Sequence, residues 1–65
     1  MAASYVDRMV TELADLQTKS KDLEAFLATP TFQTLEVQDR TLMGNQLMQM
    51  RGYEAILTER IRRAK

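Results

Sequence analysis

The side chains best suited to binding chemistry lie near the two ends of this sequence. Tyr5 and Arg8 stand close to the start, and Arg60 opens a basic C-terminal stretch that reads RIRRAK. A tyrosine ring beside several guanidinium groups suits a nucleobase and its phosphates, through stacking and bidentate hydrogen bonds. The ordinary alternative is that the cations complement the dipole of a helix C-terminus, that Tyr5 is a packing residue and that Arg8 pairs with a nearby acid.

The residue types argue against catalysis. The chain has no histidine and no cysteine, which removes disulfides, almost all transition-metal sites and the usual nucleophile–base pairs. Ser4 and Ser20 have no base close by in the sequence, and Glu12 and Asp15 form a carboxylate pair of the kind that is ordinarily solvated. The two glycines stand singly, so there is no glycine-rich phosphate loop. We therefore expect a protein that is not an enzyme and that uses no cofactor or metal.

Charge and hydropathy exclude two further classes of partner. Lys and Arg total 9, as do Asp and Glu, whereas a general nucleic-acid binder is usually clearly basic. No apolar run approaches the ~20 residues that span a bilayer, and residues 1–4 lack the basic and apolar regions of a secretory signal. We expect a cytoplasmic protein that binds neither nucleic acid in general nor a membrane.

Apolar periodicity predicts a first helix over residues 4–28. Ser4 followed by Asp7 has the form of a helix start, because a hydroxyl can accept from a free amide of the first turn. Apolar residues then recur in steps of three and four, as in a heptad seam. The seam consists of Val6, Met9, Leu13, Leu16, Leu23 and Leu27.

Ser20 fills the one missing place in this seam. Such a serine either relieves crowding where subunits cross or lines a polar pocket. The flanking Lys19 and Lys21 point to different sides of the helix, so at most one of them joins that pocket. The alternative is that both lysines are simply solvated.

The dipeptide Thr29-Pro30 ends the first helix, because the residue before a proline is pushed away from the helical region. Proline fits the first turn of a new helix, so a short helical turn is expected over residues 29–35. Phe32 should fold back there as part of a plug across the end of the hairpin. The second long helix is predicted over residues 36–63.

The second helix carries more apolar surface than one partner helix covers. Leu42, Tyr53 and Ile56 form a second row beside the one that faces the first helix. A chain of this size buries only roughly 60% of its unfolded surface, so further subunits would stabilise it. We expect one all-α domain over residues 1–65, an antiparallel two-helix hairpin with a short connecting helical turn, assembled into a helical oligomer. The alternative is a loosely covered monomer.

An ordered set of residues along both helices resembles a known family. The turn reads Phe-x5-Phe-x2-Leu from Phe26 to Leu35, and the second helix reads Met-x2-Tyr-x3-Leu-x2-Arg-Ile from Met50 to Ile61. Together with Arg8-Met9 and the leucines of the first helix, this order resembles the short phage proteins of the anti-CBASS and anti-Thoeris helical-hairpin family. The bare hairpin length is closer to the anti-CBASS type.

The resemblance implies a function. Proteins of this family form helical homo-oligomers, commonly hexamers, and act as sponges that sequester cyclic-nucleotide immune messengers without cleaving them. It implies a cyclic di- or trinucleotide ligand and a location in the cytoplasm of the infected bacterial host. Tyr5, Arg8 and Lys19 match the positions in the first helix where the family places ligand contacts, and Arg60 matches a basic position late in the second helix, so the resemblance implies that these four bind the ligand. Where a second lysine is expected before the conserved leucine, this chain has Asp22, which points to altered ligand preference or to lost binding.

Two other functions compete with the sponge. A protein-interaction or assembly module without a nucleotide ligand would hold a partner helix on the second apolar row and would leave Leu42, Met48 or Ile56 exposed. A small DNA-binding regulator would need a basic face. The basic residues gather mainly at one end, so this hypothesis ranks last.

Overall fold

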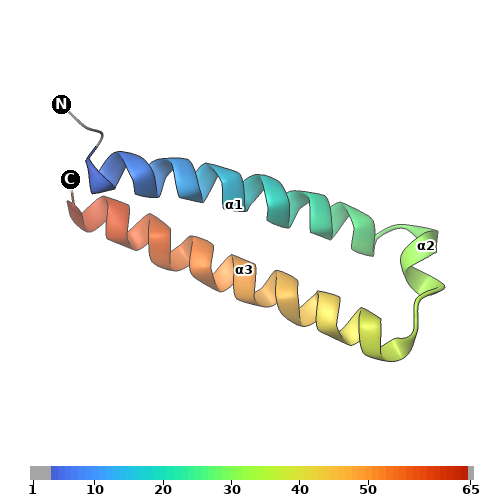
Figure 1. Cartoon of the computed structure of the whole chain (residues 1–65). Helices are drawn as coiled ribbons and strands as arrows, with labels where there is room; N and C mark the ends of the chain where they lie inside the picture. The colour runs from blue at the N-terminus through green and yellow to red at the C-terminus, as the bar shows by residue number, and fades with distance from the viewer. Residues whose placement is uncertain (1–3, 65) are drawn as a thin grey trace.

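The computed structural model describes residues 4–64, which contain three helices. The long helices α1 (Tyr5–Leu27) and α3 (Val37–Ala64) lie side by side and antiparallel, and the short helix α2 (Pro30–Gln33) closes one end (Figure 1). The all-α prediction is confirmed, and each long helix begins and ends within one residue of its expected bounds. The start of α1 therefore lies beside the end of α3.

Side-chain hydrogen bonds fix where the helices begin. The Ser4 hydroxyl accepts from the Asp7 backbone N–H at 3.2 Å, which satisfies one free amide in the first turn of α1. Thr29 does the same for α2, because its hydroxyl accepts from the Phe32 N–H at 3.3 Å. Pro30 follows in the first turn, where a missing N–H costs nothing. The predicted break at Thr29-Pro30 is thus confirmed.

Aromatic rings close the turn end of the hairpin. Phe26 of α1 and Phe32 of α2 meet edge to face, with ring centroids 6.1 Å apart and planes at 82°. This is a geometry that ring quadrupoles favour. Both rings and Leu35 are half-buried, so the expected plug is present.

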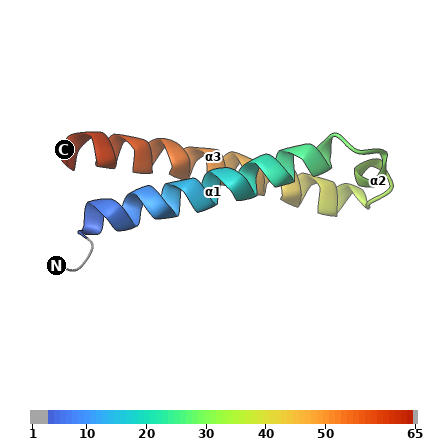
Figure 2. The same ribbon diagram turned by 90° about the horizontal axis from the view of Figure 1, so that it is seen from above.

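The tightest packing lies at the opposite end, near the chain termini. Within residues 4–64 the buried apolar side chains are Met9, Leu57 and Ile61, and Leu57 is 0% exposed. Figure 2 shows the two long helices crossing at a shallow angle. Toward the turn, the seam residues of both helices are only half-buried. The side chains that pack around the core are Val6, Leu13, Leu16 and Ala64.

Ser20 introduces a polar contact into the seam between the helices. It is 3% exposed, and its hydroxyl donates to Glu54 Oε2 on α3 at 2.5 Å. A buried polar group is costly unless it is hydrogen-bonded, so this acid explains how the seam accommodates a serine.

The hairpin is a rod that buries little of its apolar surface. It measures 49 × 17 × 14 Å, and its radius of gyration of 15.0 Å exceeds the roughly 11 Å of a compact chain of this length. The second apolar row of α3 is exposed, with fractions of 65% for Leu42, 39% for Tyr53 and 56% for Ile56. The predicted surplus of apolar surface is therefore confirmed.

Candidate functional site

One long face of the hairpin combines cations, aromatic rings and apolar side chains, and we call it the Tyr53 face. An edge of α1 meets an edge of α3 there, where the Tyr53 hydroxyl donates a hydrogen bond to Glu12 Oε2 at 2.6 Å. Steps of three and four residues place further side chains on the same two edges. The Tyr53 face comprises Tyr5, Arg8, Glu12, Asp15 and Lys19 of α1, and Leu42, Gln46, Gln49, Tyr53, Ile56 and Arg60 of α3.

A solvent-open depression of about 350 Å³ lies on the Tyr53 face. Arg8 and Lys19 are the outermost of its α1 residues, about three helical turns apart, so a positive charge stands at each end. Neither side chain forms an ion pair in the described part of the chain. The volume is at the lower end of the ~300–1,000 Å³ typical of ligand pockets. The walls are Arg8, Thr11, Glu12, Asp15, Leu16, Lys19 and Tyr53.

The arginines of the basic C-terminal stretch differ in whether they lie beside an acidic side chain. Glu59 accepts two hydrogen bonds from Arg62, at 3.0 and 2.5 Å, and its carboxylate lies 4.0 Å from Arg63. The Arg62 guanidinium thereby lowers the pKa of the Glu59 carboxyl. Arg60 has no such acidic partner among residues 4–64 and lies on the edge of α3 that carries Tyr53. Lys65 falls outside the described residues.

The contact with Glu12 controls the ionisation of Tyr53. Its hydrogen bond to the carboxylate stabilises the protonated phenol and raises the pKa of Tyr53 above 10.0. Desolvation and the negative charge of Glu12 act in the same direction, whereas the positive charge of Arg60 opposes them. Arg60 follows Tyr53 by two turns on the same edge of α3.

Neutralising Glu12 should make Tyr53 more acidic. In a Tyr5→Phe background Tyr53 is the sole tyrosine, so ultraviolet absorbance reports its titration alone. We expect Glu12→Gln to lower the pKa of Tyr53 toward 10.0, whereas Glu59→Gln leaves it unchanged. A raised pKa also means that the contact contributes fully below pH 10 and is lost as the pH rises through the raised value. An identical titration with and without Glu12 would disprove the interhelical hydrogen bond.

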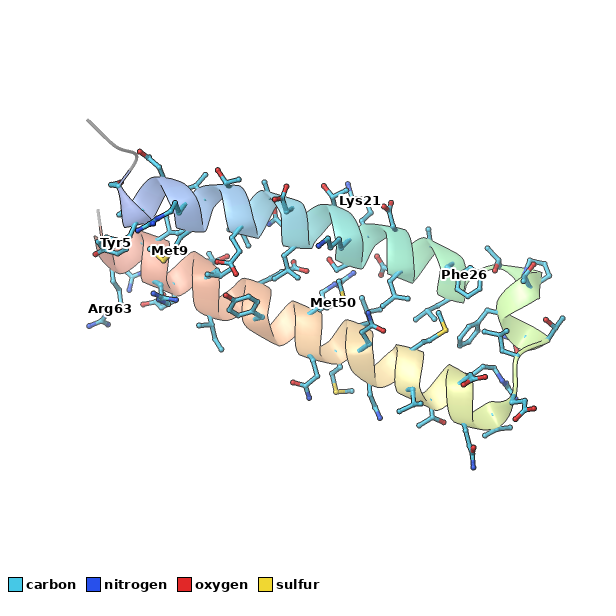
Figure 3. The ribbon with its side chains drawn as sticks, in the orientation of Figure 1. Tyr5, Met9, Lys21, Phe26, Met50 and Arg63 are labelled. Carbon is cyan, nitrogen blue, oxygen red and sulfur yellow. The ribbon has the colours of Figure 1, made fainter. Side chains whose placement is uncertain are left out.

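The structure brings two of the four predicted binding residues together and leaves the other two outside. Arg8 and Lys19 line the depression, whereas Arg60 follows the lining residue Tyr53 by two turns on the same edge of α3. Tyr5 lies 57% exposed at the start of α1, outside the depression (Figure 3). The aromatic wall is instead Tyr53, which the sequence placed only in the second apolar row. Arg60 follows Tyr53 by seven residues, and this spacing in the sequence indicates that the two side chains share one edge of the helix.

The opposite face of the hairpin is polar and internally paired. Glu24 and Arg51 form an ion pair across the helices at 2.8 Å. Lys21, and not Lys19, lines the depression beside Ser20, as expected from their opposite directions. This depression measures about 400 Å³ and is bordered by Gln17, Ser20, Lys21, Glu24, Arg51 and Glu54.

Asp22 lies away from both of these depressions. It borders a separate one on the outer surface of α1, together with Thr18 and Lys21. The departure from the family pattern at this position therefore adds no negative charge to the walls of the depression between Arg8 and Lys19.

Over residues 4–64, no three or more His, Cys, Asp or Glu side chains cluster as a metal site would require. None of the helices in that part of the chain is long and apolar enough to cross a bilayer.

Comparison with known proteins identifies a family. The family model described as Sequestin matches residues 3–63. No curated protein and no solved structure matches the chain significantly. Because the family match covers residues 3–63, most of the chain, the chain belongs to the Sequestin family, whose members are phage anti-CBASS proteins that sequester cyclic-nucleotide messengers.

Proposed function

We propose that this chain is a phage sponge that binds cyclic di- or trinucleotide messengers in the cytoplasm of the infected bacterium. It holds them without cleaving them and so blocks CBASS signalling. The family supports the sequestering role. The observation that carries the ligand class is the placement of Arg8 and Lys19 at the two ends of the depression that Tyr53 lines, with neither paired to an acid among residues 4–64. Arg60, also without an acidic partner in that range, follows Tyr53 by two turns on the same edge of α3.

The chemistry of this grouping matches a cyclic nucleotide. Arg8 and Arg60 offer forked donors that suit two phosphate oxygens at once, and Lys19 supplies a compact charge about three turns from Arg8. Tyr53 is 39% exposed and presents a ring on which a base can stack. Tyr5, on the same edge of α1, offers a second ring to a ligand that extends toward the chain termini.

Self-association would complete the site. The depression is open on one side, and the apolar side chains of Leu42 and Ile56 are exposed on the same face. A second copy packed against them would bury apolar surface and enclose a ligand that one hairpin leaves uncovered. A homo-oligomer, with the hexamer that the resemblance implies, is therefore part of the proposal.

Titration calorimetry against a panel of cyclic dinucleotides and trinucleotides tests the binding function. We expect saturable heat with at least one member, and at least tenfold weaker binding of the linear dinucleotide with the same bases. The linear molecule carries similar phosphates but lacks the closed ring, so it is the matched control for charge alone. No heat with any cyclic nucleotide would overturn the proposal, and heat with cyclic ADP-ribose alone would overturn the ligand class.

An assembly module without a nucleotide ligand is the second candidate, because Met48 is 69% exposed on a part of α3 that no partner helix covers. The chain would then bind a helix of another protein. Light scattering separates the two proposals, since the sponge requires a closed oligomer in the absence of any other protein. A monomer that gives no heat with the ligand panel would favour the module.

A further inference from the structure

Glu12 is an unexpected side chain for a site that binds an anionic ligand. It stands on the edge of α1 between Arg8 and Lys19, yet it pairs with neither cation among residues 4–64. Its Oε2 accepts a hydrogen bond from the Tyr53 hydroxyl at 2.6 Å, and its Oε1 accepts none from the described residues. A carboxylate there repels phosphates, so it favours a ligand only if the ligand offers it hydrogen-bond donors.

We propose that Glu12, oriented by Tyr53, recognises guanine, which makes the preferred ligand a guanine-containing cyclic nucleotide. The inference rests on the proposed binding of cyclic nucleotides and deepens it by naming the base. Phosphates and ribose ring oxygens are acceptors, and a free ribose hydroxyl offers a single O–H donor, so only the bases of such a ligand present paired N–H donors.

Guanine matches a carboxylate better than the other bases do. Its Watson–Crick edge presents N1–H and the N2 amino group side by side, which can reach both carboxylate oxygens at once. Adenine and cytosine each place an amino donor beside a ring nitrogen that accepts, and uracil offers one imino donor between two carbonyls. Each of those edges would set at least one acceptor against the negative charge of Glu12.

Tyr53 acts as a positioning residue for this recognition. A carboxylate oxygen has capacity for two hydrogen bonds, so Oε2 can accept the Tyr53 hydroxyl and still accept from a base. The contact joins two helices and fixes the carboxylate before any ligand arrives, which lowers the entropic cost of binding. The ring of Tyr53 forms the adjoining wall, where the recognised base can lie against it.

Base preference measured by calorimetry tests the inference. We expect wild-type protein to bind cyclic di-GMP at least tenfold more tightly than cyclic di-AMP. Glu12→Gln should weaken cyclic di-GMP binding by about 5- to 160-fold, as loss of a bidentate base contact does, and should leave cyclic di-AMP unchanged or tighter. The matched control is Asp7→Asn, which removes one negative charge from α1 outside the depression and should keep the preference.

A change in the ligand tests the same contact without a substitution. Cyclic di-IMP lacks only the N2 amino groups of cyclic di-GMP, and we expect it to bind the wild-type chain about tenfold less tightly. Equal affinity for the three ligands would overturn the role of Glu12, as would a Glu12→Gln variant that loses cyclic di-AMP and cyclic di-GMP equally. If cyclic nucleotides bind but adenine is preferred, the inference alone fails. If none binds, the proposed function fails with it.

Discussion

The charge reversal Lys19→Glu is expected to weaken ligand binding strongly while the hairpin stays folded. Lys19 is an exposed residue at one end of the depression, so its substitution removes no core contact. The new carboxylate would join Glu12 and Asp15 and repel the ligand phosphates. Removal of one partner of a charge pair in a binding site commonly costs about 2–5 kcal/mol, so we expect affinity to fall at least ~30-fold.

Lys21→Glu is the matched control for this result. The change in net charge is identical and the residue is two positions away, but Lys21 borders the depression on the opposite face. We expect affinity within about threefold of wild type, because exposed charges away from a site contribute little. Equal loss in the two variants would indicate a general effect of charge and would remove Lys19 from the binding site.

Leu57→Asp should unfold the hairpin. Leu57 is 0% exposed and packs with Met9 and Ile61 in the small buried cluster between α1 and α3. An aspartate in its place would lose the apolar contact and bury a charge without a partner, at a cost of several kcal/mol. A domain of this size has only a few kcal/mol of stability, so the helical circular dichroism should fall sharply.

Ile56→Asp separates this effect from assembly. Ile56 precedes Leu57 on the same helix but is 56% exposed on the Tyr53 face. We expect this variant to keep its helical signal at high protein concentration while light scattering shows a smaller assembly. A Leu57→Asp variant that melts at the wild-type temperature would contradict the packing between the helices.

The helices could be predicted from the sequence because their signals are local. Ser4 and Thr29 each cap the helix that follows. The dipeptide Thr29-Pro30 separates α1 from α2, because the residue before a proline is pushed away from the helical region. The heptad seam of α1 fixed which face would be buried. The spacing of Glu59 from Arg62 and Arg63, three and four residues, also favours their pairing on one helix.

The contacts between the helices could not be predicted in the same way. The sequence indicates that Ser20 occupies a position in an apolar seam, but it does not indicate the hydrogen-bond partner Glu54, which is 34 residues away. Glu12 and Tyr53 are 41 residues apart. Such pairs depend on the rotation and register of one helix against the other, which apolar periodicity leaves open by a residue or more. The predicted site therefore named Arg8 and Lys19, which line the depression, but placed the aromatic ring at Tyr5 alone.

Sequestration itself is tested most directly by following the fate of the messenger. Excess protein is incubated with a cyclic nucleotide from the panel, the mixture is passed through a filter that retains the protein, and the retained fraction is then heat-denatured. We predict that the filtrate contains almost no messenger and that heating releases it chemically intact by chromatography and mass spectrometry. Messenger that stays in the filtrate, or that is recovered as a linear or hydrolysed product, would contradict a sponge.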